Sequence, residues 1–171
     1  MIRFAAPIRR RPLSSNVRCH TSIRMDEPLY FYTKSMPFWG LSNFAPPGIQ
    51  ADGVYWETIE HYFQAQKFSD LSLRERIRRA ATPKDARELG QTRRHPLRPD
   101  WDSVREEVML FAMRLKFKAP SARELLLSTG ERELIESSPY DYYWACGEDG
   151  TGLNRLGQLL MQVRSEIKAA A

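Results

Sequence analysis

The stretch WETIEHYFQAQKF, residues 56–68, decides how this sequence folds. Three of its apolar residues, Ile59, Tyr62 and Phe63, recur at the spacing of one helix face. Because residues three and four positions apart lie on the same side of a helix, the pattern predicts an amphipathic helix over 58–68. Its apolar side is expected to face the core of the domain.

A polar stripe borders the apolar side of the same helix. Glu60, Gln64 and Lys67 project within about 40° of their neighbours in the set, next to Phe63. A carboxylate, an amide and an ammonium on one edge can stabilise a developing cation and orient a sugar. The alternative is a solvated helix edge without a function, and periodicity alone favours that alternative.

Short strands are expected before this helix. The aromatic segment 28–34 predicts a strand, and the Pro- and Gly-rich segment 36–48 predicts a loop. Residues 49–56 predict a hairpin around Asp52-Gly53, a dipeptide typical of a type I′ turn.

Helices are expected after it. The first opens with a capping box at Ser72 and Glu75, and the second is a short helix with Thr82 as N-cap, Pro83 as first residue and Gly90 after its end. A long helix follows over 101–117, and then a short helix capped at Ser121 and Glu124. The last is a strongly amphipathic helix over 153–167. The expected fold is α+β: a single compact, helix-dominated domain over 28–169 with a small antiparallel sheet near its N-terminus.

Length and composition exclude several classes of protein. With 171 residues the chain has room for one domain with a proper core. No apolar run approaches the ~20 residues of a membrane span. Two cysteines cannot build a disulfide framework, and the three histidines are isolated from cysteines and from one another, which argues against a zinc site.

The positive charge is concentrated in an N-terminal tail. The net charge is +5, but six of the 26 basic residues and none of the 21 acidic ones lie in the first 25 positions. Three interpretations of residues 1–27 stay open: a disordered arm, an Arg- and Ser-rich targeting peptide, or a segment that is not translated, with Met25 as the true start. The near-neutral body does not by itself support a nucleic-acid footprint.

Two other segments are candidate sites. Asp141 precedes three aromatic residues, and an acid in an apolar pocket has a raised pKa that suits a general acid. Alternatively Asp141 is a turn residue and the aromatics belong to the core. The Gly-rich loop 147–154 opens the last helix, where backbone N–H groups can bind phosphate, but its two acids repel anions and an ordinary turn is the simpler interpretation.

Taken together, these segments resemble the NADAR family, also called the YbiA-like family. The resemblance runs from about residue 29 to 168, and the residues that carry it are Phe31-Tyr32, the WGLSNF loop 39–44, the helix 56–68, Trp101, Val108-Met109, Lys116-Phe117, 126–130, 141–144, 147–157 and 160–164.

The resemblance implies an N-glycosidase that hydrolyses early phosphoribosylamino-pyrimidine intermediates of riboflavin synthesis and releases ribose 5-phosphate. In this scheme Glu60 is the charge stabiliser or general base and Asp141 the second acid. Lys67 faces the ribose, where it holds phosphate or forms a transient Schiff base. The substrate-binding residues are the stacking Trp101 and Trp144, the polar Asn43, Gln64 and Asn154, and the loop from Gly147 to Gly152. The scheme requires no cofactor and no metal.

Two other functions stay open. Some members of the family resemble hydrolases that remove ADP-ribose from guanine bases of nucleic acid, and the basic tail or the arginines 74, 76, 78 and 79 would favour that activity. A non-catalytic module that binds NAD or ADP-ribose is the third. The expected location is the cytoplasm, or an organelle if the tail is a targeting peptide; the sequence does not specify an oligomeric state.

Overall fold

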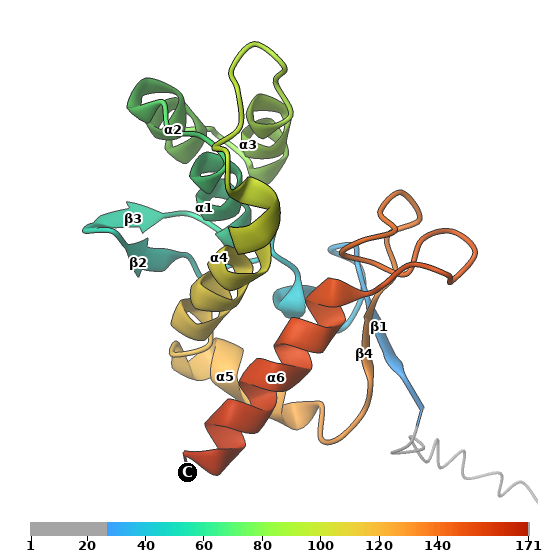
Figure 1. Ribbon diagram of the computed structural model, residues 1–171. Coiled ribbons are helices and arrows are strands. Elements are labelled where there is room, and N and C mark those ends of the chain that lie inside the picture. Colours follow the sequence, from blue (N-terminus) through green and yellow to red (C-terminus); the bar gives the residue numbers. More distant parts are fainter. Residues whose placement is uncertain (1–26, 171) are drawn as a thin grey trace, which may run out of the picture.

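The computed structural model describes residues 27–170 (Figure 1). The predictions for the basic tail fall on residues 1–26 and lie outside this part. The elements are β1 (Leu29–Phe31), the 3-10 helix η1 (Trp39–Leu41), β2 (Ile49–Ala51), β3 (Val54–Trp56), α1 (Ile59–Gln66), α2 (Leu71–Arg78), α3 (Pro83–Gly90), α4 (Trp101–Lys116), α5 (Pro120–Ser128), β4 (Leu134–Glu136) and α6 (Arg155–Ala169). The helix-dominated α+β domain is therefore confirmed.

Helix α1 lies at the centre of the helical part. It contacts α2, α3 and α4, and all eight of its residues are buried. Thr58 caps its N-terminus by accepting a hydrogen bond from the N–H of His61. The apolar side predicted for this helix is therefore buried, and its polar residues Glu60 and Gln64 are buried as well.

The strands form two separate pairs. β2 and β3 make the expected antiparallel hairpin, and both Asp52 (φ 53°) and Gly53 (φ 76°) have the positive φ of a type I′ turn. β1 does not join them. It pairs in parallel with β4, an unpredicted strand, so that Leu29 lies opposite Leu134. A parallel partner requires a long crossover, and nothing in the local sequence of either strand specifies it.

Two of the expected helix caps are wrong. The N-cap of α2 is Asp70, whose carboxylate accepts from the N–H groups of Ser72 and Leu73, so the helix begins before the expected capping box. Helix α5 begins with Pro120 and has no side-chain cap, because its N-cap residue is Ala119, whose methyl side chain cannot accept a hydrogen bond. Thr82 caps α3 as expected, with Pro83 at its first position.

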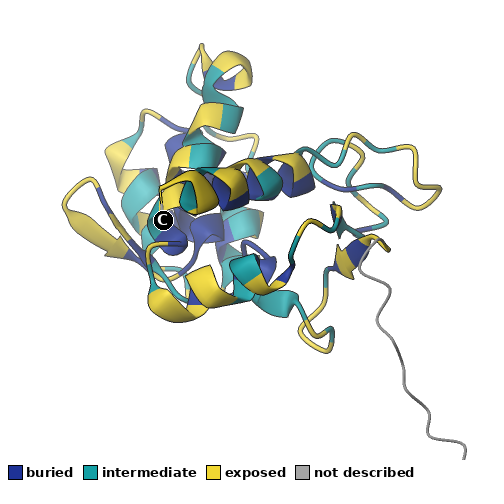
Figure 2. Cartoon of the chain, turned by 90° about the horizontal axis from the view of Figure 1, so that it is seen from below, coloured by how far each residue is buried: buried dark blue, intermediate teal, exposed yellow. Residues whose placement is uncertain are grey.

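Helix α6 closes the domain on the side of the β1–β4 pair. Its buried face, dark blue in Figure 2, packs against β4 and α4, while its other face is exposed. The hydrophobic core includes Leu156, Leu160 and Val163 of this face. No helix within residues 27–170 is long and apolar enough to cross a membrane.

Candidate active site

A cavity of about 400 Å³ lies where α1, α3, the loop around η1 and the segment after β4 meet. This volume lies in the range of small-molecule sites. Six of the ten predicted site residues line it: Asn43, Glu60, Gln64, Lys67, Asp141 and Trp144. The other lining residues are Tyr32, Thr33, Trp39, Ser42, Phe44, Phe63, Arg87, Gln91, Met109, Glu136 and Ser138.

Glu60 and Gln64 form a fixed pair on α1. Gln64 Nε2 donates to Glu60 Oε1 at 2.8 Å, one helical turn away. Burial raises the pKa of Glu60, and the hydrogen bond from Gln64 and the charges of Arg87 and Lys67 oppose this effect. Gly90 of α3 leaves room for the amide: a Cβ there would lie 2.1 Å from Gln64 Oε1. Close packing of α3 on α1 therefore fixes the orientation of the carboxylate.

Lys67 follows the last residue of α1 and is half-buried beside α3. Its Nζ donates to the carbonyl oxygen of Gly90 at 3.4 Å and lies 5.7 Å from the ring centre of Phe63. Burial lowers the pKa of this ammonium, the nearby charge of Arg87 lowers it further, and Glu60 opposes both. A lysine with a lowered pKa loses its proton more easily and is a better nucleophile than an exposed one.

Two further carboxylates line the cavity, Glu136 from β4 and Asp141 from the loop that follows it. Burial, together with the charges of Asp141 and Glu60, raises the pKa of Glu136 to about 8. Within residues 27–170 its carboxylate has no hydrogen-bond or ion-pair partner. Asp141 Oδ1 accepts from the backbone N–H groups of Tyr143 and Trp144. Asp141 is thus both the turn residue and a cavity residue, which joins the two interpretations of the sequence.

A buried lysine of α4 fixes the backbone of the loop that carries Asn43. Lys116 of α4 donates from Nζ to the carbonyl oxygens of Ser42 (2.8 Å) and Ala45 (2.9 Å), and burial lowers its pKa to about 7. Asn43 Nδ2 donates to Met109 Sδ at 3.4 Å, and the carbonyl of Asn43 accepts from the N–H of Glu60. Among the described residues, Asn43 Oδ1 is buried without a hydrogen-bond partner.

Aromatic rings form the apolar wall. The ring of Phe63 lies 5.4 Å from Trp144, edge to face, and 5.0 Å from Trp101. Trp144 reaches the cavity, but Trp101 is buried behind Phe63 and does not line it. The flat surfaces available to a heterocycle are therefore Trp144, Phe63 and the rings of Trp39, Phe44 and Tyr32.

The structure places the Gly-rich loop away from the cavity. Gly147 has φ +71° and packs under the ring of Tyr142, and the N–H of Gly152 donates to the carbonyl of Cys146. Asn154 adopts a left-handed conformation, accepts from the N–H of Glu136 at 3.0 Å and donates to the carbonyl of Leu134 at 2.8 Å. Its side chain thus fixes β4, the strand that carries Glu136.

The sequence matches a known protein family. The NADAR domain profile matches residues 30–168. The chain belongs to the NADAR family.

Relatives of this NADAR domain cover most of its length. It is 45% identical to the N-glycosidase Npun_R5314 of Nostoc punctiforme over 144 residues, which are 82% of this chain and 92% of the relative. It is also 45% identical to the N-glycosidase YbiA of Escherichia coli over 146 residues, 85% of this chain and 91% of the relative. A riboflavin biosynthesis protein of Zea mays, the chloroplastic PYRR, is 40% identical over 153 residues, 80% of this chain but 25% of that longer protein.

The same similarity extends to three dimensions. The NMR structure of YbiA from E. coli superposes with a TM-score of 0.78 at 45% identity, and the match covers 85% of this chain and 87% of that one.

Two charged residues of the NADAR cavity, Glu136 and Arg87, were not among the predicted site residues. Glu136 lies in an unpredicted three-residue strand. Arg87 lies one turn before Gly90 on α3, and only the packing of α3 on α1 brings it to the cavity. The sequence marks Gly90 only as a residue at the end of a helix, which does not indicate that α3 packs against α1 there. Within residues 27–170, no group of three or more His, Cys, Asp or Glu residues is arranged to hold a metal ion.

Proposed function

We propose that this protein is an N-glycosidase that hydrolyses the N-ribosyl bond of phosphoribosylamino-pyrimidine intermediates of riboflavin synthesis and releases ribose 5-phosphate. One observation carries the proposal: carboxylates from α1, β4 and the following loop, Glu60, Glu136 and Asp141, line one aromatic-walled cavity together with Lys67. The N-glycosidase and riboflavin-biosynthesis relatives support the reaction class and the substrate class.

Glu136 is suited to protonate the leaving nitrogen. With its pKa raised to about 8, the carboxyl group of Glu136 is mainly neutral at pH 7. An acid with a pKa near the working pH donates its proton most effectively in the transition state. In this role Glu136 takes the place that the sequence assigned to Asp141, whose Oδ1 is already committed to two backbone N–H groups.

Glu60 is suited to stabilise the positive charge on the ribose and to accept a proton from the attacking water. As the C–N bond breaks, positive charge develops on the ribose ring, and a nearby carboxylate stabilises it. Water then attacks the anomeric carbon. The sugar takes the hydroxyl, Glu60 takes the remaining proton of the water, and the nitrogen leaves with the proton from Glu136. Proton exchange with solvent restores both carboxyl groups.

The other lining groups bind and orient the substrate. Asn43 and Gln64 both line the cavity, and their side-chain amides are the polar groups assigned to the ribose hydroxyls. Trp144 and Phe63 offer faces for the pyrimidine. Lys67 faces the sugar, and its lowered pKa also suits a transient Schiff base with the opened ribose, the covalent alternative to direct hydrolysis.

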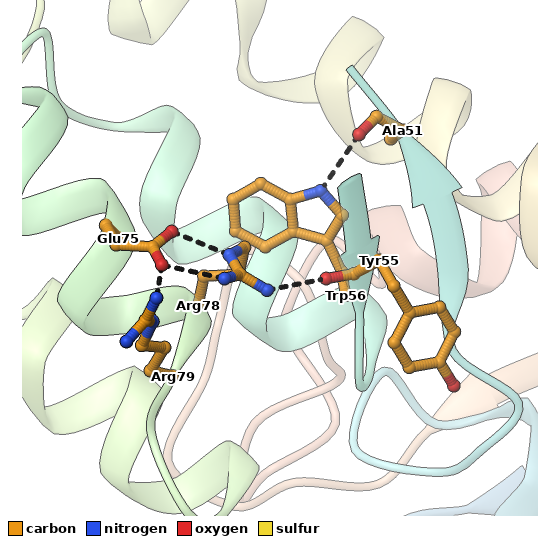
Figure 3. A network of polar contacts seen from close by, with 6 residues as sticks. All are labelled: Ala51, Tyr55, Trp56, Glu75, Arg78 and Arg79. Carbon is orange, nitrogen blue, oxygen red and sulfur yellow. Dashed lines mark hydrogen bonds and ion pairs between the residues drawn. The ribbon is translucent and has the colours of Figure 1, made fainter. Parts of the chain in front are cut away.

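Two carboxylates, Glu75 and Asp52, compensate half of the charge on the basic face that would favour a nucleic-acid substrate. Arg78 and Arg79 both pair with Glu75, and Arg78 also donates to the carbonyl of Tyr55 (Figure 3). Arg74 lies 3.8 Å from Asp52. Arginines with carboxylate partners attract phosphates less than free ones, so this face is a weaker site for nucleic acid than its four arginines suggest.

The test is turnover of the phosphoribosylamino-pyrimidine by the wild type, Glu60→Gln and Glu57→Gln. Glu57 is exposed and lies outside the cavity, so its variant is a matched control for the same change of residue. We expect Glu60→Gln to lower kcat by about 10²- to 10⁴-fold and Glu57→Gln to behave as the wild type. Full turnover by Glu60→Gln would refute the assigned role.

A further inference from the structure

The cavity contains one permanently charged group that the proposed reaction does not use. Arg87 of α3 lines the cavity and is half-buried. Within the described chain its guanidinium has no carboxylate within 4.0 Å and no hydrogen-bond acceptor, whereas Arg78, Arg98, Arg114 and Arg155 are all paired with acids. A guanidinium left unpaired beside a concave site is available to an anion from outside.

Arg87 and Lys67 differ in what they can do, although both are cations beside the C-terminal end of α3. Lys67 is held by the carbonyl of Gly90, and burial lowers the pKa of its ammonium, so its charge is conditional. A guanidinium stays charged at every physiological pH, and its planar fork matches two phosphate oxygens. The sequence left two roles open for Lys67, phosphate binding and a transient Schiff base. The structure favours Arg87 for phosphate binding and leaves the Schiff base to Lys67.

We propose that Arg87 is the anion-binding end of the cavity and holds the phosphate on C5 of the ribosyl substrate. Resting on the proposed function, this assigns a direction to the bound substrate. The phosphate lies toward α3, and the glycosidic bond lies toward Glu60 and Glu136. Gln91, at the C-terminal cap of α3 and also in the lining, offers an amide to the same end.

A rival role for Arg87 is charge compensation. The charge of Arg87 opposes the rise in the pKa of Glu60 and of Glu136, so it acts on the space that these carboxylates share. If this were its only role, removing the guanidinium would change the protonation of the carboxylates for every substrate, whether or not the substrate carries a phosphate.

The deciding experiment compares the phosphoribosyl substrate with its dephosphorylated counterpart. We would measure kcat/KM for both with the wild type, Arg87→Ala, Arg87→Lys and Lys84→Ala, an exposed α3 lysine outside the cavity that serves as control. We expect Arg87→Ala to reduce the preference for the phosphorylated substrate by about 10- to 100-fold, mainly through KM. Arg87→Lys retains part of the preference, and Lys84→Ala retains all of it.

A second readout does not depend on turnover. Inorganic phosphate titrated into the wild type should bind and should shift cavity resonances in an NMR spectrum, with weaker binding by Arg87→Ala. Equal losses on both substrates, together with a shifted pH profile, would overturn the phosphate assignment in favour of charge compensation. A wild type that cleaves neither substrate would refute the proposed function, and the phosphate titration would still decide the subsite.

Discussion

Replacing Glu136 with glutamine removes a titratable proton from the cavity and keeps the shape of the side chain. Burial and the neighbouring Asp141 and Glu60 raise the pKa of Glu136 from 4.5 to about 8. If this proton is the one delivered to the leaving nitrogen, Glu136→Gln lowers kcat by about 10²- to 10⁴-fold at pH 7. A substrate whose leaving group needs no protonation should lose much less.

The pH profile gives the sharper test of the same variant. Wild-type kcat should fall as the pH rises above about 8, because Glu136 loses its proton there. The residual activity of Glu136→Gln should lack this descending limb. A variant that keeps the limb at pH 8, or that loses less than about tenfold in kcat, would refute the role of Glu136 as proton donor.

The raised pKa also affects folding. Between about pH 4.5 and pH 8 the folded state binds more protons than the unfolded state, so the free energy of unfolding falls as the pH rises through this window. The shift from 4.5 to about 8 corresponds to about 5 kcal/mol as an upper bound. Denaturant titrations at pH 5 and pH 8 should therefore show that Glu136→Gln gains stability relative to the wild type at the higher pH.

Three further changes test how the fold supports the cavity. Because burial lowers the pKa of Lys116 to about 7, the wild type should gain several kcal/mol of unfolding free energy relative to Lys116→Met as the pH rises from 7 to 10; a constant difference would contradict this. Gly90→Ala gains about 1 kcal/mol of helix propensity but forces Gln64 away, so urea titrations should show a net loss of ~1–2 kcal/mol, with lower turnover because Glu60 loses its partner. Asn154→Ala should lower the free energy of unfolding by ~2–3 kcal/mol, because it removes two hydrogen bonds and strains the left-handed backbone. Asn154→Gly should lower it less, because glycine also lacks the two hydrogen bonds but adopts the left-handed backbone without strain. Equal losses would exclude a backbone contribution.

Local patterns account for the part of the site that the sequence predicts. Glu60 and Gln64 lie in α1 and Lys67 is its C-cap residue, so their shared face follows from helical spacing, and this face borders a cavity. Asn43 and Trp144 lie in loops whose composition is unusual enough to be noticed. Their places in the cavity follow from contacts that no spacing rule describes.

The missed residues depend on contacts between distant parts of the chain. Glu136 reaches the cavity because β4 pairs in parallel with β1 and because Asn154 holds its backbone. Arg87 reaches it because α3 packs against α1. The incorrect cap at Ser72 has a different cause: Asp70, two residues earlier, is an equally good N-cap, and propensity alone does not choose between them.

The most direct test of the central claim is product identification by mass spectrometry. The wild type and Glu60→Gln would each be incubated with the phosphoribosylamino-pyrimidine and, separately, with an oligonucleotide carrying ADP-ribosyl-guanine. The cavity predicts ribose 5-phosphate and the free pyrimidine amine from the wild type, with both products nearly absent for Glu60→Gln. An intact small substrate, or ADP-ribose released from the oligonucleotide as the sole product, would contradict it.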